Sequence, residues 1–159
     1  MLYLYHQENK GDISMTTFNF APTANKNHGI AVEWGICSHY MIERVAHDHS
    51  SYDTDSDVNV GNKHMSVKSS KFTLMSGSLC EGQTTFDGIW NLYASKVHSN
   101  CFVYGTKDGK AYEMNLDEFK QFVYTFCSLE RESEKNGGAM KIRCRAESKK
   151  MLKWLEERA

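Results

Sequence analysis

Polar side chains of several chemical types recur at alternate positions between residues 57 and 68. They comprise a carboxylate, an amide, an imidazole, a hydroxyl and an ammonium group, carried by Asp57, Asn59, His64, Ser66 and Lys68. Oxygen ligands suit Mg²⁺, which prefers carboxylates and water and activates a water molecule for attack on a phosphodiester. A lysine beside such a site orients the water or stabilises the charge that develops on the phosphate. These residue types indicate phosphodiester hydrolysis if the fold brings them to one surface.

The apolar residues of the same stretch predict a β-hairpin. Val58 and Val60 precede the turn Gly61-Asn62-Lys63, and Met65 and Val67 follow it. Successive side chains of a strand point to opposite faces, so apolar residues facing a core leave the polar set together on the outward face. An ordinary exposed hairpin has the same alternation, and an aspartate before a strand is common turn chemistry. The hairpin therefore has a catalytic and a purely structural interpretation.

The segments Asp57-Val58-Asn59-Val60 and Met65-Ser66-Val67-Lys68-Ser69-Ser70 resemble the active-site hairpin of the PD-(D/E)xK nuclease superfamily, the type II restriction endonuclease-like fold. The resemblance covers residues 28–145. It implies an α/β (α+β) core with a central mixed β-sheet flanked by helices. It further implies a DNA endonuclease that uses Mg²⁺ or Mn²⁺ and cuts double-stranded DNA as a homodimer.

The resemblance also assigns roles to individual residues. Asp57 matches the first acid and binds the metal, and Lys68 matches the lysine that positions the attacking water. Glu33, on the helix before the hairpin, matches an accessory acid and metal ligand. Ser66 or the backbone carbonyl of Val67 completes the site.

Two departures from the family pattern leave an alternative open. Ser66 stands where the second acid is expected, and no proline precedes Asp57. A hydroxyl is a neutral ligand, so the site has one negative charge fewer for a divalent cation. The alternative is a catalytically inactive relative, such as a DNA-binding or phage or plasmid accessory protein.

Apolar periodicity predicts the elements around the hairpin. A helix is expected from residue 28 to about residue 47, with a buried stripe at spacings of three and four, and an acidic loop is expected at 48–57. The stripe consists of Ile30, Trp34, Cys37, Met41 and Val45. Residues 1–27 are expected to form a loosely packed lead-in to a single domain whose core is 28–159.

Further elements are predicted after the hairpin. They are a helix over 86–97, a second hairpin around Lys107-Asp108-Gly109-Lys110, a helix over 115–130, a strand over 140–145 and a last helix capped by Ser148. Asn115 followed by Glu118 resembles a capping box. Helices and strands alternate throughout, which favours an α/β or α+β fold around a mixed sheet.

Basic residues are concentrated near the C-terminus. The 159-residue chain has 19 Lys and Arg against 20 Asp and Glu, a net charge of -1. Residues 139–159 hold seven of these bases against three acids, a local charge of +4, whereas the rest of the chain carries -5. The total excludes a chain that is basic throughout, but not a local nucleic-acid surface. The candidate DNA contacts are Lys141, Arg143 and Arg145 on one strand face, with Ser69, Ser70 and Lys71 after the hairpin. A solvated face that keeps the chain soluble is the structural alternative.

Composition disfavours a disulfide-bonded, secreted, membrane-spanning or zinc-binding protein. The five cysteines are an odd number without a CxxC pair, which predicts reduced thiols in a cytoplasmic protein. No apolar run reaches the roughly 20 residues of a membrane span, and residues 1–6 lack the features of a signal peptide. A zinc site of Cys37, His39, His47, Asp48 and His49 is disfavoured, because Cys37 and His39 lie about 200° apart around a helix.

Overall fold

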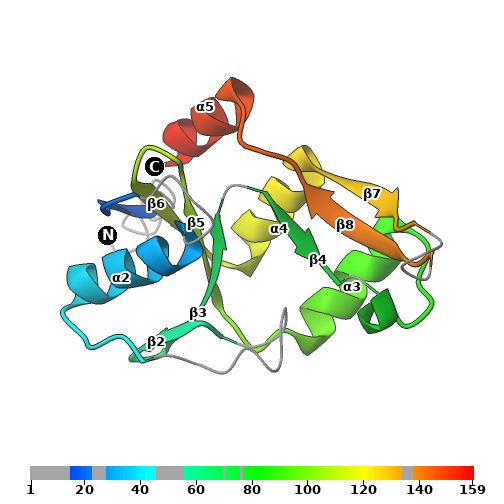
Figure 1. Cartoon of the computed structure of the whole chain (residues 1–159), viewed down its shortest axis with the longest axis horizontal. Coiled ribbons are helices and arrows are strands. Elements are labelled where there is room, and N and C mark those ends of the chain that lie inside the picture. The colour runs from blue at the N-terminus through cyan, green and yellow to red at the C-terminus, as the bar shows by residue number, and fades with distance from the viewer. Residues whose placement is uncertain (1–14, 23–27, 46–55, 70, 76, 134–137) are drawn as a thin grey trace, which may run out of the picture.

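The protein is an α/β protein with two sheets and four α-helices in the part of the chain that the computed structural model describes (Figure 1). That part comprises residues 15–22, 28–45, 56–69, 71–75, 77–133 and 138–159. The helices are α2 (His28–Tyr40), α3 (Phe86–Lys96), α4 (Leu116–Phe126) and α5 (Lys149–Arg158), with a short 3₁₀ helix at Gly77–Cys80. The strands are β1 (Thr16–Asn19), β2 (Val58–Val60), β3 (Lys63–Ser69), β4 (Phe72–Leu74), β5 (Cys101–Gly105), β6 (Lys110–Met114), β7 (Cys127–Arg131) and β8 (Met140–Cys144).

The larger sheet is mixed and has the strand order β1-β6-β5-β3-β2. The two hairpins expected from the sequence are present as the antiparallel pairs β2–β3 and β5–β6. β3 and β5 are parallel, and the chain passes from one to the other through β4 and α3. The smaller sheet is antiparallel, in the order β4-β8-β7. The predicted mixed sheet with flanking helices is thus confirmed.

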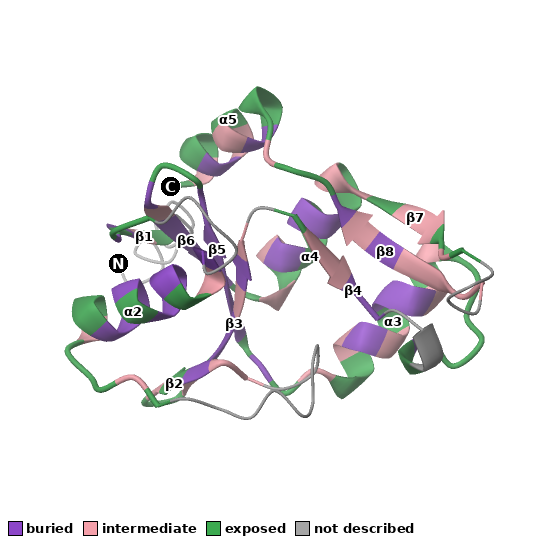
Figure 2. Cartoon of the chain, viewed as in Figure 1, coloured by how far each residue is buried: buried purple, intermediate pink, exposed green. Residues whose placement is uncertain are grey.

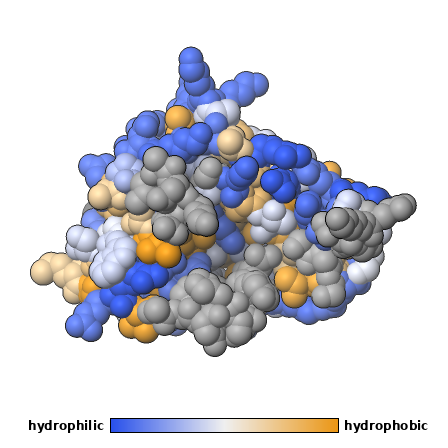
Figure 3. Space-filling view, in the orientation of Figure 1, coloured by the Kyte–Doolittle hydropathy of each residue, from blue (hydrophilic) through white to orange (hydrophobic). Residues whose placement is uncertain are grey.

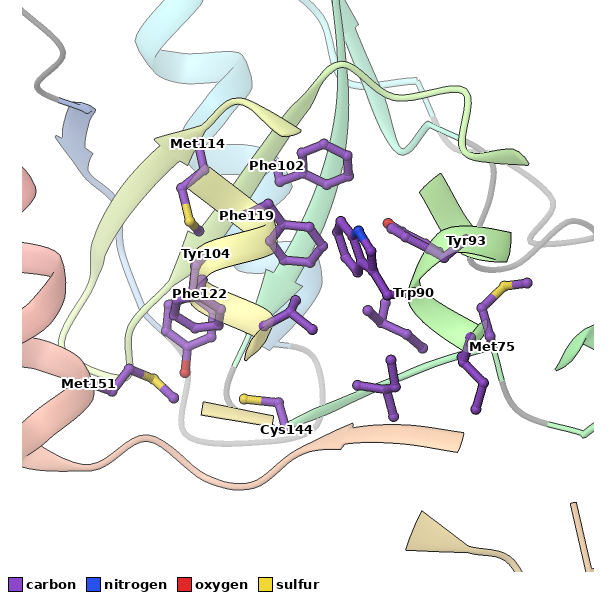
Figure 4. Close-up of a cluster of buried hydrophobic side chains, with 14 of the residues drawn as sticks. Met75, Trp90, Tyr93, Phe102, Tyr104, Met114, Phe119, Phe122, Cys144 and Met151 are labelled. Carbon is purple, nitrogen blue, oxygen red and sulfur yellow. The ribbon is translucent and has the colours of Figure 1, made fainter. Parts of the chain in front are cut away.

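Two apolar clusters cover opposite faces of the larger sheet. The first joins Phe102 and Tyr104 of β5 to α3, α4 and the smaller sheet (Figure 4). Its centre is aromatic, with the rings of Phe102 and Phe119 stacked 4.5 Å apart. The second cluster joins Met65 and Val103 to helix α2. Strand β5, between the two clusters, is buried along its whole length (Figure 2).

Capping side chains fix the starts of α4 and α5 at the positions predicted from the sequence. Asn115 accepts from the backbone of Glu118, whose side chain accepts from the backbone of Asn115, and this completes the predicted capping box. Ser148 caps α5 in the same way through the amide of Met151. Such caps satisfy backbone donors that have no partner within the helix.

The predicted helix over 28–47 is too long, and its predicted stripe is mostly wrong. α2 ends at Tyr40, and Met41 adopts a left-handed φ of 57°. Trp34 is 58% exposed, Met41 88% and Val45 76%, whereas Cys37 is buried as expected. The face that packs on the sheet is built instead from Ala31, Val32, Gly35 and Ile36 together with Cys37.

Three strands are absent from the sequence-based prediction. β1 pairs with β6 at the edge of the larger sheet and buries Phe18, so this part of the predicted lead-in belongs to the fold. β7 begins directly after α4, where the pattern predicts helix as far as residue 130. The short strand β4 completes the smaller sheet.

Candidate functional site

The β2–β3 hairpin has the register that side-chain alternation predicts. Val58 pairs with Met65, and Asn59 pairs with His64, whose Nδ1 lies 2.8 Å from the Asn59 amide oxygen. Gly61 in the turn has a φ of +58°, a left-handed conformation that glycine adopts without strain. The hairpin is therefore a well-defined platform.

Asp57 is attached to β3 by two hydrogen bonds. Its Oδ2 accepts from the backbone N–H of Val67 at 2.7 Å, and its own N–H donates to the carbonyl of Met65 at 2.7 Å. The carboxylate thus takes the place of a backbone acceptor beyond the start of β2. It lies next to Val67, one residue from Lys68.

Ser66 and Lys68 lie on the face of the sheet that the aromatic cluster covers. Their parallel partners on β5 are Phe102 and Tyr104, both in that cluster. Ser66 is 1% exposed and Lys68 8%, so the expectation of an open outward face is wrong for these two residues. The physical reason is that α4 and the smaller sheet fold back over this end of β3.

Lys68 is a buried cation that has no acidic partner among the described residues. Its Nζ lies 5.6 Å from the centre of the Phe72 ring. Within the described segments, no Asp or Glu forms an ion pair with it. Burying a charged group without a counter-ion destabilises a fold, and such groups concentrate at functional sites. Lys68 therefore has a stronger case for a functional role than an ordinary strand lysine.

Glu33 comes from the opposite side of the sheet. It lies on α2, which covers the face of Met65, and it is 6% exposed. Its Oε1 accepts from Arg44, with Nε and Nη2 each at 3.1 Å. Asp57 is thus bonded to Val67, the Ser66 and Lys68 side chains lie on the aromatic side of β3, and Glu33 is paired with Arg44 on the α2 side.

This ion pair gives a testable prediction for Glu33. Glu33→Gln should lower the free energy of unfolding by about 1–2 kcal/mol, because it leaves Arg44 partly buried without its counter-ion. Urea denaturation measures the change. In an Arg44→Met background the same substitution should cost clearly less. An equal cost in both backgrounds would show that the pair does not stabilise the fold.

The basic strand β8 presents its charged residues away from the aromatic cluster. Ile142 and Cys144 are buried in the cluster, whereas Lys141 and Arg143 alternate with them and are half-buried on the other face. Arg143 pairs with Thr73 and Ser128 across the smaller sheet, and its Nε is buried with no hydrogen-bond partner in the described ranges. Hydrophilic side chains follow the upper and right margins of this view, over α5 and the smaller sheet (Figure 3). This surface has donors available for an anion.

The other residues predicted to contact DNA differ in whether their side chains are exposed and unpaired enough to reach a phosphate. Arg145 donates to Glu130 at 2.6 Å, an exposed ion pair. Lys71 is exposed and Ser69 is half-buried. Ser70 lies outside the described residues, as do His47, Asp48 and His49 of the disfavoured zinc set.

Sequence reasoning missed a polar cluster on the α2 side of the sheet. Glu113, 6% exposed, accepts from the Tyr40 hydroxyl and from Nζ of Lys63, the latter at 2.8 Å. Burial opposes the charge on Lys63, but its hydrogen bonds to Glu113 and Tyr40 raise its pKa; burial and the bond to Glu113 raise the pKa of Tyr40. Glu113 and Lys63 line a surface pocket of about 430 Å³. The sequence signal for this cluster was Glu113 itself, an acid at an inward-facing position of the largely apolar strand β6.

In the described portion, no three His, Cys, Asp or Glu side chains converge to hold a metal ion. No described helix has the length and apolar character needed to cross a membrane. All five cysteines are free thiols.

No protein-family model, curated protein or solved structure matches this chain.

Proposed function

We propose that this protein is a metal-dependent DNA endonuclease with a restriction endonuclease-like core. The observation that carries the proposal is the bond from the backbone N–H of Val67 to the Asp57 carboxylate, one residue before Lys68, whose side chain is buried. A carboxylate that can hold a metal ion and a lysine that can stabilise charge on the phosphate are groups that metal-dependent phosphodiester hydrolysis uses. The order helix, hairpin, crossover helix and parallel strand (α2, β2–β3, α3, β5) supports the fold assignment.

The donor set fits Mg²⁺ or Mn²⁺ in chemical type. Asp57 would supply a carboxylate, and the Ser66 hydroxyl and the Val67 carbonyl would supply neutral oxygens. Mg²⁺ keeps several waters and is bound by one or two carboxylates together with substrate phosphates, so one protein carboxylate is enough once DNA is present. Glu33 joins this set only if it leaves Arg44. The bound ion would activate water and neutralise charge on the phosphate.

Lys68 and Asp57 would have distinct roles in catalysis. Lys68 would orient the attacking water and stabilise the negative charge that builds on the phosphate in the transition state. Its burial strengthens that electrostatic effect, because a charge acts more strongly away from bulk water. Asp57 would hold the metal while its bond to Val67 fixes the carboxylate. Two copies of the chain would be needed to cut both strands of a duplex, so we propose a homodimer.

DNA backbone contacts are proposed for the basic face of the smaller sheet. Lys141 and Arg143 share that face, with Lys71 and Arg145 close in sequence to its strands. The Arg143 guanidinium, whose buried Nε has no hydrogen-bond partner in the described part of the chain, supports a phosphate ligand there. Ser69 and Ser70 would add hydroxyl donors at the end of β3.

A salt titration tests this surface. Each phosphate contact that is lost reduces the slope of log binding constant against log salt concentration by about one. Arg143→Gln should therefore weaken duplex binding and lower the slope by about one, as measured by fluorescence anisotropy. Lys96→Gln is the matched control, because Lys96, at the end of α3, already pairs with Glu81. Equal slopes for all three proteins would contradict a role for Arg143.

A non-catalytic DNA-binding protein on the same scaffold is the second candidate. Ser66, a neutral residue in place of the second acid, is the observation that favours it. A calorimetric titration with Mn²⁺ in the presence of a duplex separates the two. The enzyme should bind the ion at a site that Asp57→Asn removes. If DNA binds but no Mn²⁺ site is lost in the variant, the non-catalytic function is correct.

A further inference from the structure

Two cysteines that the proposed mechanism does not use lie directly opposite each other. Cys127 begins β7, and Cys144 ends β8 as its register partner. Directly opposed residues of an antiparallel pair have Cα atoms about 4.5–5.5 Å apart and side chains on one face. Disulfides span Cα distances of about 4.4–6.8 Å. The backbone therefore places the two thiols where a bond between them needs only a small adjustment.

The two thiols already interact. The interaction between them lowers the pKa of Cys144 against the effect of burial. The same interaction, together with burial, raises the pKa of Cys127. The pair therefore favours the thiolate at Cys144, and Cys127 becomes a nucleophile by passing its proton to that thiolate. Thiolate rather than thiol is the reactive form toward oxidants.

Lys68 adds a positive charge at the same place. Its charge opposes the rise in the pKa of Cys127 that Cys144 and burial cause. Phe72, whose ring contacts Lys68, is the register partner of Cys144 on the other edge of β8. The cysteine pair therefore lies at the contact between the smaller sheet and the lysine of β3.

The two cysteines differ in access. Cys127 is half-buried, and the side chain of Cys144 is fully buried at the edge of the aromatic cluster (Figure 4). This difference assigns the first reaction with an oxidant to Cys127 and the closing reaction to Cys144.

From these observations we infer that Cys127 and Cys144 form a peroxide-oxidisable dithiol that closes reversibly to a cross-strand disulfide. The Cys127 thiolate attacks one oxygen of hydrogen peroxide, the O–O bond breaks, and hydroxide leaves to become water with the proton of the pair. The resulting Cys127 sulfenic acid is then attacked by the Cys144 sulfur. The S–S bond forms, the S–O bond breaks, and the hydroxide that leaves takes a proton from the solvent, which received one when the thiolate formed. The two thiols lose two electrons and peroxide gains them. The proposal does not depend on nuclease activity.

The test is oxidation of the folded, full-length protein with hydrogen peroxide, followed by alkylation and peptide mass spectrometry. We expect a peptide linking Cys127 to Cys144 that dithiothreitol reduces, whereas Cys37 and Cys101 stay alkylated. Lys68→Met should slow formation of the link at least about threefold, because it removes the charge that favours the thiolate. Cys101→Ser, a buried cysteine of the opposite cluster, should form the link at the wild-type rate.

Two further variants keep the test decisive. Cys127→Ser and Cys127→Ala, each with an unchanged circular dichroism spectrum, should form no linked peptide. The proposal fails if the wild-type protein takes up oxygen at Cys127 without linking to Cys144. It also fails if the link forms equally among other cysteine pairs, or if Lys68→Met reacts at the wild-type rate.

Discussion

Replacement of Lys68 by methionine is expected to abolish DNA cleavage and at the same time to stabilise the protein. Methionine has a similar length and no charge, so it fills the site beside Phe72 without placing an ammonium group in the interior. Removal of that buried charge should raise the free energy of unfolding by about 1–2 kcal/mol, after allowance for the lost contact with the Phe72 ring. Loss of the charge at the phosphate should reduce cleavage by at least about 100-fold.

Opposite changes in stability and activity are typical of a residue kept for function at the expense of the fold. Urea denaturation and a cleavage assay on the same preparation measure both. Lys71→Met is the matched control, because Lys71 is exposed three residues further along the chain. It should change stability by less than about 0.5 kcal/mol and leave the rate of cleavage within a few-fold of wild type. A Lys68→Met protein that is less stable and equally active would assign Lys68 a structural role.

The second large effect is expected at Asp57, where two substitutions separate chemistry from folding. Asp57→Asn keeps an amide oxygen that can accept from the Val67 N–H, so the free energy of unfolding should change by less than about 0.5 kcal/mol. It removes the negative charge that a divalent cation requires. We expect cleavage to fall by at least about 100-fold in this variant.

Asp57→Ala is expected to differ from Asp57→Asn in stability. It removes the acceptor as well as the charge, and the Val67 N–H at this edge of the hairpin loses its partner. We expect a loss of about 1–2 kcal/mol in the free energy of unfolding, together with the same loss of cleavage. If Asp57→Asn cleaved as fast as wild type while Asp57→Ala was unstable, Asp57 would be a turn residue and nothing more.

Local signals predicted the hairpins and the helix starts because the interactions that fix them are local. The turn at Gly61, the capping box of Asn115 and Glu118, and the cap at Ser148 each involve residues within a few positions of one another. The chain needs no distant contact to specify them. The same holds for the Asp57 bond to Val67, which the hairpin register brings about.

The buried face of α2 was not predictable from the apolar pattern. The pattern gives weight to large residues, and so it selects Ile30 and Trp34. The helix instead packs through small ones: a Cβ added at Gly35 would lie 2.3 Å from Cβ of Phe20, a residue that follows β1. That close approach depends on a segment outside the helix, within the predicted lead-in.

Burial of Lys68 was unpredictable for a related reason. Strand alternation separates the two faces of β3 but does not say what covers each face. The cover on the Lys68 side comes from Phe72 on β4 and from α4, and β4 joins its sheet only through β8, about 70 residues later.

The most direct test of the central claim is the conversion of supercoiled plasmid to nicked or linear DNA by purified wild-type protein, compared with Asp57→Asn at equal concentration. Each protein is incubated with Mg²⁺, with Mn²⁺ and with a chelator in parallel. If Asp57 and Lys68 form a hydrolytic site, the wild-type protein cuts with either ion and not with the chelator, and Asp57→Asn cuts at least about 100-fold more slowly. Failure of the wild-type protein to cut under every condition, or equal cutting by the variant, would contradict the proposed function.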